Sequence, residues 1–232
     1  MMPWFVWNNK NSSAMGLWIS KLPKITRAEE RYDTVEVPGR AGSLIMLEGE
    51  DVYESYMKEC TVQTRRNNPL MQEILDWLRG DGELVFSNEI GFMYNGRIAA
   101  AVSFDRISND LAQAKIPFFV EPFKMHRYPD KDKITFSANG TIINPGNVSS
   151  KPKVKVTCTG TVAITIGGET MTFYSMAGTI IIDCDARIIT AGGNIWGGTS
   201  SGEFWTIPVG RSSITISGAS ATVEIEPNWR WV

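Results

Sequence analysis

A strict alternation of apolar and polar residues in the second half of the chain constrains its fold more than any other feature. Apolar side chains recur at alternate positions over residues 154–158 and 162–166, and Gly167-Gly168 turns the chain into a further segment of the same kind. Because successive side chains of a β-strand point to opposite faces of the sheet, this pattern predicts strands with one buried face. The alternating apolar positions are Val154, Val156, Cys158, Val162, Ile164, Ile166, Met171 and Phe173.

The rest of the second half indicates the same fold class. From Ile134 onward there is no apolar stripe at helical spacing, and short segments rich in Thr, Val and Ile are separated by Gly, Asn and Pro. Many short alternating strands at nearly regular spacing are typical of an antiparallel β-sandwich. The composition changes near residues 128–133, so we predict an N-terminal domain over 1–130 and a C-terminal β-sandwich over 131–232.

The first half is predicted to combine strands with one helix. Residues 27–37 and 52–64 have the pattern of long, half-exposed strands, although Lys58 interrupts the apolar parity of the second. The dipeptide Asn95-Gly96 is a strong hairpin signal and predicts a two-residue turn between strands. We therefore expect the N-terminal domain to be mainly β and sandwich-like.

The segment NPLMQEILDWLRG predicts the helix, at about 68–79. Asn68 is a good N-cap, Pro69 suits the first helical position, and Gly80 suits the position just past the end. An apolar stripe at i, i+4 spacing indicates that one face of the helix packs on a sheet. Trp77 lies away from the centre of that stripe, either at the edge of the core or in contact with another molecule.

Composition and charge exclude several classes of function. The 232 residues include 23 Lys and Arg against 25 Asp and Glu, so we expect no basic surface for specific nucleic-acid binding. The three cysteines are far apart and His126, the only histidine, has no metal-spaced partner, which predicts no metal and no other cofactor. Apolar runs are too short to cross a bilayer, and the N-terminal segment lacks a signal-peptide pattern. We expect a soluble protein made in a reducing cytosol, without membrane insertion.

No pattern in the sequence predicts catalysis. Walker and G-x-S-x-G motifs do not occur. Asp183 and Asp185 would share one face of a strand, as a glycosidase carboxylate pair could, but exposed polar residues at a strand end are the commoner explanation. The turn VEVPGRAGSL places Arg40 among glycines without the lysine or the helix start of a phosphate-binding loop. We therefore expect no enzyme, and Arg40 is predicted to lie at a corner that contacts protein.

Two tryptophans leave a second class of function open. The segment NIWGGTSSGEFW places Trp196 and Trp205 in a Gly/Ser-rich stretch. Exposed tryptophans in such a loop would form a stacking platform for sugars, which predicts a carbohydrate-binding module for host surface glycans as the alternative. The same loop could instead fold over the sandwich as a lid.

The order of motifs along the chain resembles the distal tail proteins of phages with long non-contractile tails. The resemblance begins with a Trp/Phe-rich first strand and continues through PKITRAEERYDTVEVPGRAG, LDWLRGDGELVFSNE and IPFFVEPFKMHRY in the first half. It extends over INPGNVSSKPKVKVTCTG, IIIDCDAR, IPVGRSSITIS and EPNWRW in the second half. No single motif is specific alone, and their order over two domains makes the case.

The resemblance implies a structural virion protein at the tip of the tail. In this family the N-terminal domains form a hexameric ring, the hub between the tail tube protein and a tail-associated fibre or baseplate hub protein. The C-terminal domain would be galectin-like and could anchor receptor-binding proteins. Galectin-type sugar binding requires a histidine, and residues 134–232 contain none. Since interface energy concentrates in aromatic and arginine side chains, the candidate oligomer contacts, which core packing would explain equally well, are Arg40, Tyr53, Tyr56, Trp77 and Tyr94.

Overall fold

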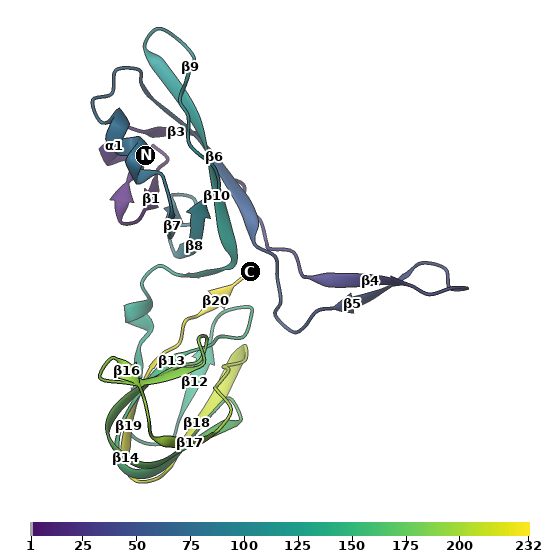
Figure 1. Ribbon diagram of the computed structural model, residues 1–232, viewed down its shortest axis with the longest axis vertical. Coiled ribbons are helices and arrows are strands. Elements are labelled where there is room, and N and C mark those ends of the chain that lie inside the picture. Colours follow the sequence, from purple (N-terminus) through teal and green to yellow (C-terminus); the bar gives the residue numbers. More distant parts are fainter. Residues whose placement is uncertain (1) are drawn as a thin grey trace. The chain divides into compact units, whose positions relative to one another are not determined.

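The protein is mainly β, as the sequence predicts, with its strands paired in antiparallel sheets. The computed structural model describes residues 2–232 (Figure 1). Two compact units make up the chain: the first ends at Arg127 and includes Val232, and the second is Tyr128–Trp231. The two units divide between residues 127 and 128, whereas the sequence predicts a boundary between residues 130 and 131. Within the described residues, no helix is both long enough and apolar enough to cross a membrane.

The first unit is built on one antiparallel sheet with the strand order β2-β1-β7-β8-β10-β6-β3, and β9 pairs with β10. Alternate residues of β10 from Ala112 to Val120 are buried because one face of the strand covers the core. The strands of the sheet are β1 (Phe5–Trp7), β2 (Lys10–Asn11), β3 (Trp18–Lys21), β6 (Tyr56–Arg65), β7 (Asp81–Phe86), β8 (Phe92–Ile98), β9 (Asp105–Arg106) and β10 (Leu111–His126). The unit also contains a 3₁₀ turn, Ser12–Met15, the helix α1 (Met71–Trp77) and a hairpin of β4 (Tyr32–Glu36) and β5 (Ser43–Leu47).

The helix is shorter than the predicted 68–79. Asn68 does not cap α1 directly but accepts a hydrogen bond from the Leu70 amide at 2.9 Å, which closes a turn before the helix begins at Met71. The Asn68 side-chain amide donates to the Met15 carbonyl at 3.0 Å and to the Thr64 hydroxyl at 2.8 Å. Asn68 therefore joins the start of the helix to the sheet, and this tertiary role decides where the helix begins.

The predicted hairpin turn at Asn95-Gly96 is wrong. Both residues lie inside β8, where Gly96 pairs with Gly82 of β7 and with Val120 of β10. A Cβ atom on Gly96 would stand 2.5 Å from the Phe119 carbonyl oxygen, so the close approach of two strands explains this glycine. The turn between β7 and β8 lies at residues 87–91.

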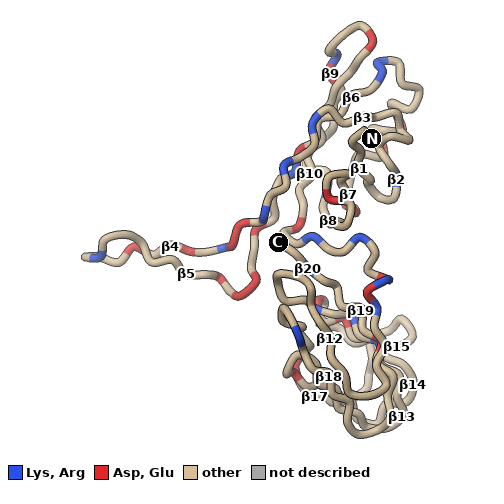
Figure 2. The backbone as a smooth tube through the Cα atoms, turned by 180° about the vertical axis from the view of Figure 1, so that it is seen from behind, with Lys and Arg blue, Asp and Glu red and all other residues tan. Residues whose placement is uncertain are grey.

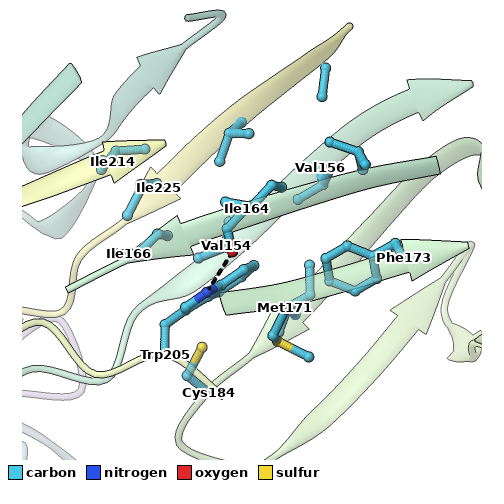
Figure 3. Packing of buried hydrophobic residues seen from close by; sticks show 14 of the residues in the cluster. Val154, Val156, Ile164, Ile166, Met171, Phe173, Cys184, Trp205, Ile214 and Ile225 are labelled. Atoms are coloured by element: carbon cyan, nitrogen blue, oxygen red, sulfur yellow. Dashed lines mark hydrogen bonds between the residues drawn. The ribbon is translucent and has the colours of Figure 1, made fainter. Parts of the chain in front are cut away.

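The second unit confirms the alternating pattern from which its strands were predicted. The even-numbered apolar residues of β13 (Lys153–Ile166) are almost fully buried, from Val154 to Ile166. The first part of β13 pairs with β19 and the last part with β18, while β14 runs along its other side with an irregularity between Gly160 and Val162. This shared central strand organises the core of the unit (Figure 3).

The remaining pairs of the second unit extend from these central strands. Its main strand order is β11-β19-β13-β14-β15-β16, with β12 on β18 and β17 on β14. The bounds are β11 (Ile134–Phe136), β12 (Gly140–Asn144), β14 (Glu169–Asp183), β15 (Ile188–Ala191), β16 (Asn194–Ile195), β17 (Thr199–Gly202), β18 (Gly210–Gly218), β19 (Ala221–Glu226) and β20 (Arg230–Trp231), preceded by a 3₁₀ turn, Pro129–Asp132.

Candidate subunit interface

The hairpin of β4 and β5 is the most unusual surface of the first unit. Among residues 2–232 these two strands pair only with each other, and every residue of both strands is exposed. In Figure 1 the hairpin stands apart from the sheet that holds β6 and β10. We call residues 30–53 the arm, because an antiparallel bridge between Glu30 and Tyr53 closes its base.

Apolar side chains cover both faces of the arm. Tyr32 faces Leu47 across the ladder, which places both on one face, and Val35 faces Leu44 on the other. An isolated two-stranded hairpin is at best marginally stable in water, and contiguous exposed apolar patches mark interaction sites. The arm therefore has the character of an element that another molecule covers. Its exposed apolar residues are Tyr32, Val35, Val37, Leu44, Ile45, Met46 and Leu47.

Polar and aromatic contacts hold the base of the arm. Arg31 pairs with Glu48 across the two strands at 3.3 Å. The Arg27 guanidinium lies 6.0 Å from the centre of the Tyr53 ring, whose edge meets Phe123 of β10 at a centroid distance of 5.8 Å. Tyr53, a predicted interface residue, thus anchors the arm to the sheet of its own unit.

The turn that carries Arg40 lies at the free end of the arm. The Arg40 amide donates to the Val37 carbonyl at 3.1 Å, and Gly39 and Gly42 both adopt φ of +83°, a conformation that suits glycine. Within the described chain Arg40 forms no ion pair, and it is the only Lys or Arg between Arg31 and Lys58. Figure 2 shows the resulting single blue segment at the end of the hairpin. No helix begins beside it, so the phosphate-cradle alternative has no structural basis.

The other predicted interface residues lie elsewhere. Trp77 stacks on Phe5 at a centroid distance of 5.6 Å and donates its indole N–H to the Trp7 carbonyl at 3.0 Å. Tyr94 is fully buried in the core of its own unit. Tyr56 is half-buried beside it. The five residues do not form one surface: Arg40 and Tyr53 occupy the two ends of the arm, and the other three belong to the body of the unit.

Tyr94 belongs to a buried polar cluster that the sequence analysis missed. Its hydroxyl donates to the Glu89 carboxylate at 2.8 Å, and Glu89 also pairs with Lys58 at 3.0 Å and with Lys124 at 3.2 Å. The Lys58 ammonium donates further to the Lys24 carbonyl at 3.4 Å and lies 4.6 Å from the centre of the Tyr94 ring. The signal for this cluster was present in the sequence, because Lys58 interrupts an otherwise apolar parity.

Charge is retained in this cluster despite burial. Burial lowers the pKa of Lys58, and the Glu89 carboxylate acts in the opposite direction. For Glu89, burial favours the neutral form, but the Tyr94 hydrogen bond and the Lys58 charge together hold its pKa below the usual value. Burial and the Glu89 hydrogen bond and charge raise the pKa of Tyr94. At neutral pH Glu89 therefore accepts hydrogen bonds as a carboxylate from a neutral tyrosine and two lysines.

The residues singled out in the second unit have structural partners. Trp205 is fully buried and donates its indole N–H to the Ile164 carbonyl at 3.2 Å, so it offers no face for sugar stacking (Figure 3). Trp196 is partly buried against Phe173 at a centroid distance of 5.9 Å. This geometry corresponds to the lid interpretation of the loop.

The carboxylates of the second unit take part in ion pairs. Asp185 pairs with Lys151 at 3.2 Å and with Arg230 at 3.0 Å. Burial opposes ionisation of Asp185, but these cations outweigh it and lower its pKa. Asp183 pairs with Lys153 at 3.4 Å and accepts the Asp185 amide at 3.1 Å. No group of three His, Cys, Asp or Glu suited to a metal ion occurs within residues 2–232.

Comparison with solved structures identifies a protein of the same fold. The chain is similar to the Dit protein of phage SPP1, described as a paradigm of the hub adsorption apparatus in phages that infect Gram-positive bacteria, with a TM-score of 0.73. The fold is that of a phage tail hub protein. The likeness covers 97% of this chain and 98% of the SPP1 Dit chain at 10% sequence identity. No protein-family profile and no curated protein sequence matches the chain.

Proposed function

We propose that this chain is a non-catalytic structural protein of a phage virion, located at the distal tip of a non-contractile tail. The observation that carries the proposal is the fold shared with SPP1 Dit over nearly the whole length of both chains. At 10% identity this correspondence reflects the backbone rather than individual side chains. The proposed function therefore rests on the domain architecture and on the kinds of contact that the exposed surfaces can form.

The protein assembles as a homohexameric ring through its first unit. The arm supports this part of the proposal, because it exposes seven large apolar side chains and two strands without further partners in the described chain. A contact between an arm and a different surface on the next copy is heterologous, and such contacts close into a ring when the rotation per subunit permits. Burial of the arm in a neighbour removes its apolar faces from water.

The ring joins the tail tube protein to a tail-associated fibre or baseplate hub protein. The second unit, which we expect to be galectin-like, serves as the anchor for receptor-binding proteins, and the hub needs no cofactor, specific nucleic-acid contact or membrane insertion. On the surface of this unit Lys153 and Lys155 pair with carboxylates of the neighbouring strands β14 and β19, and Lys151 pairs with Asp185. The protein is synthesised in the cytoplasm of the host bacterium and is then built into the tail.

Native mass spectrometry and negative-stain electron microscopy of the purified full chain test the proposal. We expect six subunits and ring-shaped particles at micromolar concentration. A variant in which residues 33–46 are replaced by a short Gly/Ser turn keeps the Arg31–Glu48 pair and the Tyr53 anchor, so it should remain folded but monomeric. A wild-type chain that stays monomeric, alone and with its tail tube protein, would contradict the ring.

A further inference from the structure

We infer that the tip of the arm docks through Arg40 into an acidic depression on the first unit of the next copy. The inference rests on the proposed ring and names the two surfaces that form its contact. The depression has a volume of about 430 Å³ and lies on the solvent-facing side of β7, β8 and β10. Its charge, its apolar neighbours and the chemistry of the arm tip each argue for this pairing.

The depression carries an excess of negative charge. It is lined by three carboxylates, Asp81, Glu83 and Glu121, and by one guanidinium, that of Arg97. Asp81 pairs with Arg97 at 3.4 Å, and Glu121 accepts a hydrogen bond from the Asn95 amide at 3.3 Å. Across the described chain Glu83 and Glu121 have no cationic partner. Two carboxylates are therefore available to a cation from outside.

Apolar side chains lie next to these carboxylates. Phe119 lines the depression and pairs across the sheet with Arg97 on one side and with Met57 of β6 on the other. The side chains of Phe119 and Met57 are 42% and 51% exposed, which is unusual for large apolar residues in the middle of a sheet. The surface thus presents an acidic hollow beside an apolar ridge.

The tip of the arm has the complementary composition. Arg40 is its only cation and is separated from the apolar pair Val37-Pro38 by Gly39 alone. An arginine forms bidentate hydrogen bonds with carboxylates and stacks on aromatic rings, so it suits Glu83, Glu121 and Phe119 together. Val37 and Pro38 would then pack against the apolar ridge. Gly39 and Gly42 have no atom within 4 Å of the position that a Cβ would occupy, and Arg40 itself is exposed.

The arm is long enough to reach a neighbouring subunit. Arg40 at the tip lies ten positions after Glu30 at the base, and an extended strand rises about 3.3 Å per residue. The arm therefore spans about 30 Å, close to the diameter of a small domain. A second copy of this chain is the occupant that the charge complementarity favours, because the matching cation and apolar pair occur together on its own arm.

A charge-reversal cycle on the full chain tests the contact by sedimentation velocity over a concentration series. We expect Arg40→Glu and the double variant Glu83→Arg/Glu121→Arg each to raise the concentration needed for ring assembly by about tenfold or more. The triple variant should return it to within about threefold of wild type. The controls Arg79→Glu and Asp76→Arg reverse charges on exposed side chains outside the depression and should leave assembly unchanged.

Cysteine cross-linking provides a second measurement, which reports directly on which residues are neighbours in the assembled ring. The native Cys60, Cys158 and Cys184 are buried, so Arg40→Cys/Glu121→Cys introduces the accessible thiols. A short bismaleimide, which bridges two thiols across a gap comparable to the Arg–Glu pair that they replace, should yield covalent ladders up to the hexamer. Arg40→Cys/Asp76→Cys should not, because Asp76 lies on α1, outside the depression.

The outcomes separate the contact from the ring. If the wild type forms rings and Arg40→Glu assembles equally well, the proposed contact is wrong and the hub proposal stands. The same holds if the triple variant does not reverse the loss of assembly seen in Arg40→Glu and in Glu83→Arg/Glu121→Arg. A monomeric wild-type chain overturns the ring and the contact with it. Melting temperatures within about 2 °C of wild type would exclude misfolding as the cause, since surface substitutions of this kind change stability little.

Discussion

Removal of the Lys58 charge should destabilise the first unit far more than removal of an exposed lysine in an equally short ion pair. The Lys58 ammonium and the Glu89 carboxylate lie 3.0 Å apart, and both side chains are almost completely buried. Removing one partner of a buried ion pair costs about 3–5 kcal/mol, because the other charge stays buried without it. After Lys58→Met, Glu89 still has Lys124 and Tyr94. We therefore expect a loss near the lower end, about 3 kcal/mol of unfolding free energy.

The matched control is the exposed pair of Lys10 and Glu73. Their atoms are 2.8 Å apart, but both side chains are about half exposed, at 50% and 51%. Lys10→Met should therefore cost less than about 1 kcal/mol. The two variants remove the same charge and differ mainly in the burial of the pair.

Native-state hydrogen exchange in urea measures this loss within each unit. Peptides from β6 and β8 report on the first unit, and peptides from β13 serve as an internal reference in the second. The double variant Lys58→Met/Glu89→Gln completes the cycle and should be at least about 1.5 kcal/mol more stable than additivity predicts. A single-variant cost below about 1 kcal/mol, or strict additivity, would refute the role assigned to the pair.

The same cluster predicts an acid dependence of stability. Because the folded pKa of Glu89 lies below its unfolded value, Glu89 contributes stability above the unfolded pKa of about 4.3, and the contribution is lost as the pH falls through the folded pKa. Unfolding free energy of the first unit, measured by the same exchange experiment between pH 6 and pH 3, should decline more steeply in wild type than in Glu89→Gln. Parallel curves would contradict the assignment.

Three further predictions concern individual side chains. Trp205→Ala should destabilise the second unit by about 3–5 kcal/mol in urea unfolding, because it removes a fully buried indole and its hydrogen bond to Ile164; a cost below about 1 kcal/mol would place Trp205 outside the core. Gly96→Ala should cost about 1–3 kcal/mol in the same assay, since its Cβ meets the rigid backbone of β10, and a neutral effect would contradict this close approach. Burial raises the pKa of the Cys184 thiol to about 12, so a thiol reagent at pH 8 should modify it only after unfolding, as mass spectrometry of the intact chain would show.

The sequence predicts those parts of the fold where one physical factor dominates. In β13 the alternation alone determines which residues are buried, because one whole face of the strand covers the core. Asn95-Gly96 fails as a turn because the chain continues as a strand between β7 and β10, and no local signal reports the proximity of those neighbours. Trp205 follows a Gly/Ser-rich stretch, yet its ring packs in the core, where the carbonyl of Ile164, far away in sequence, satisfies the indole N–H.

The arm illustrates the limit for the candidate site. The sequence predicts a long, half-exposed strand over residues 27–37. The structure exposes both faces of β4, because β5 is its only partner among the described strands. The pattern of apolar and polar side chains in a sequence indicates which residues are covered. It does not indicate whether the covering surface belongs to the same chain or to another molecule. Arg40 lies in an exposed turn, and its contact with another subunit stays a prediction.

An arm with two open edges also makes the newly synthesised subunit prone to aggregation. Strands with free backbone groups and apolar side chains pair with one another indiscriminately, and natural proteins counter this with charges and prolines. In the arm, Asp33 and Glu36 are charged residues of β4, and Pro38 lies two residues after its end. These residues weaken pairing between unassembled arms, since like charges would meet across such a contact. The composition of β4 thus combines solubility of the free subunit with the ability to bind a neighbouring subunit. With a more hydrophobic arm, the subunits would aggregate before they assembled.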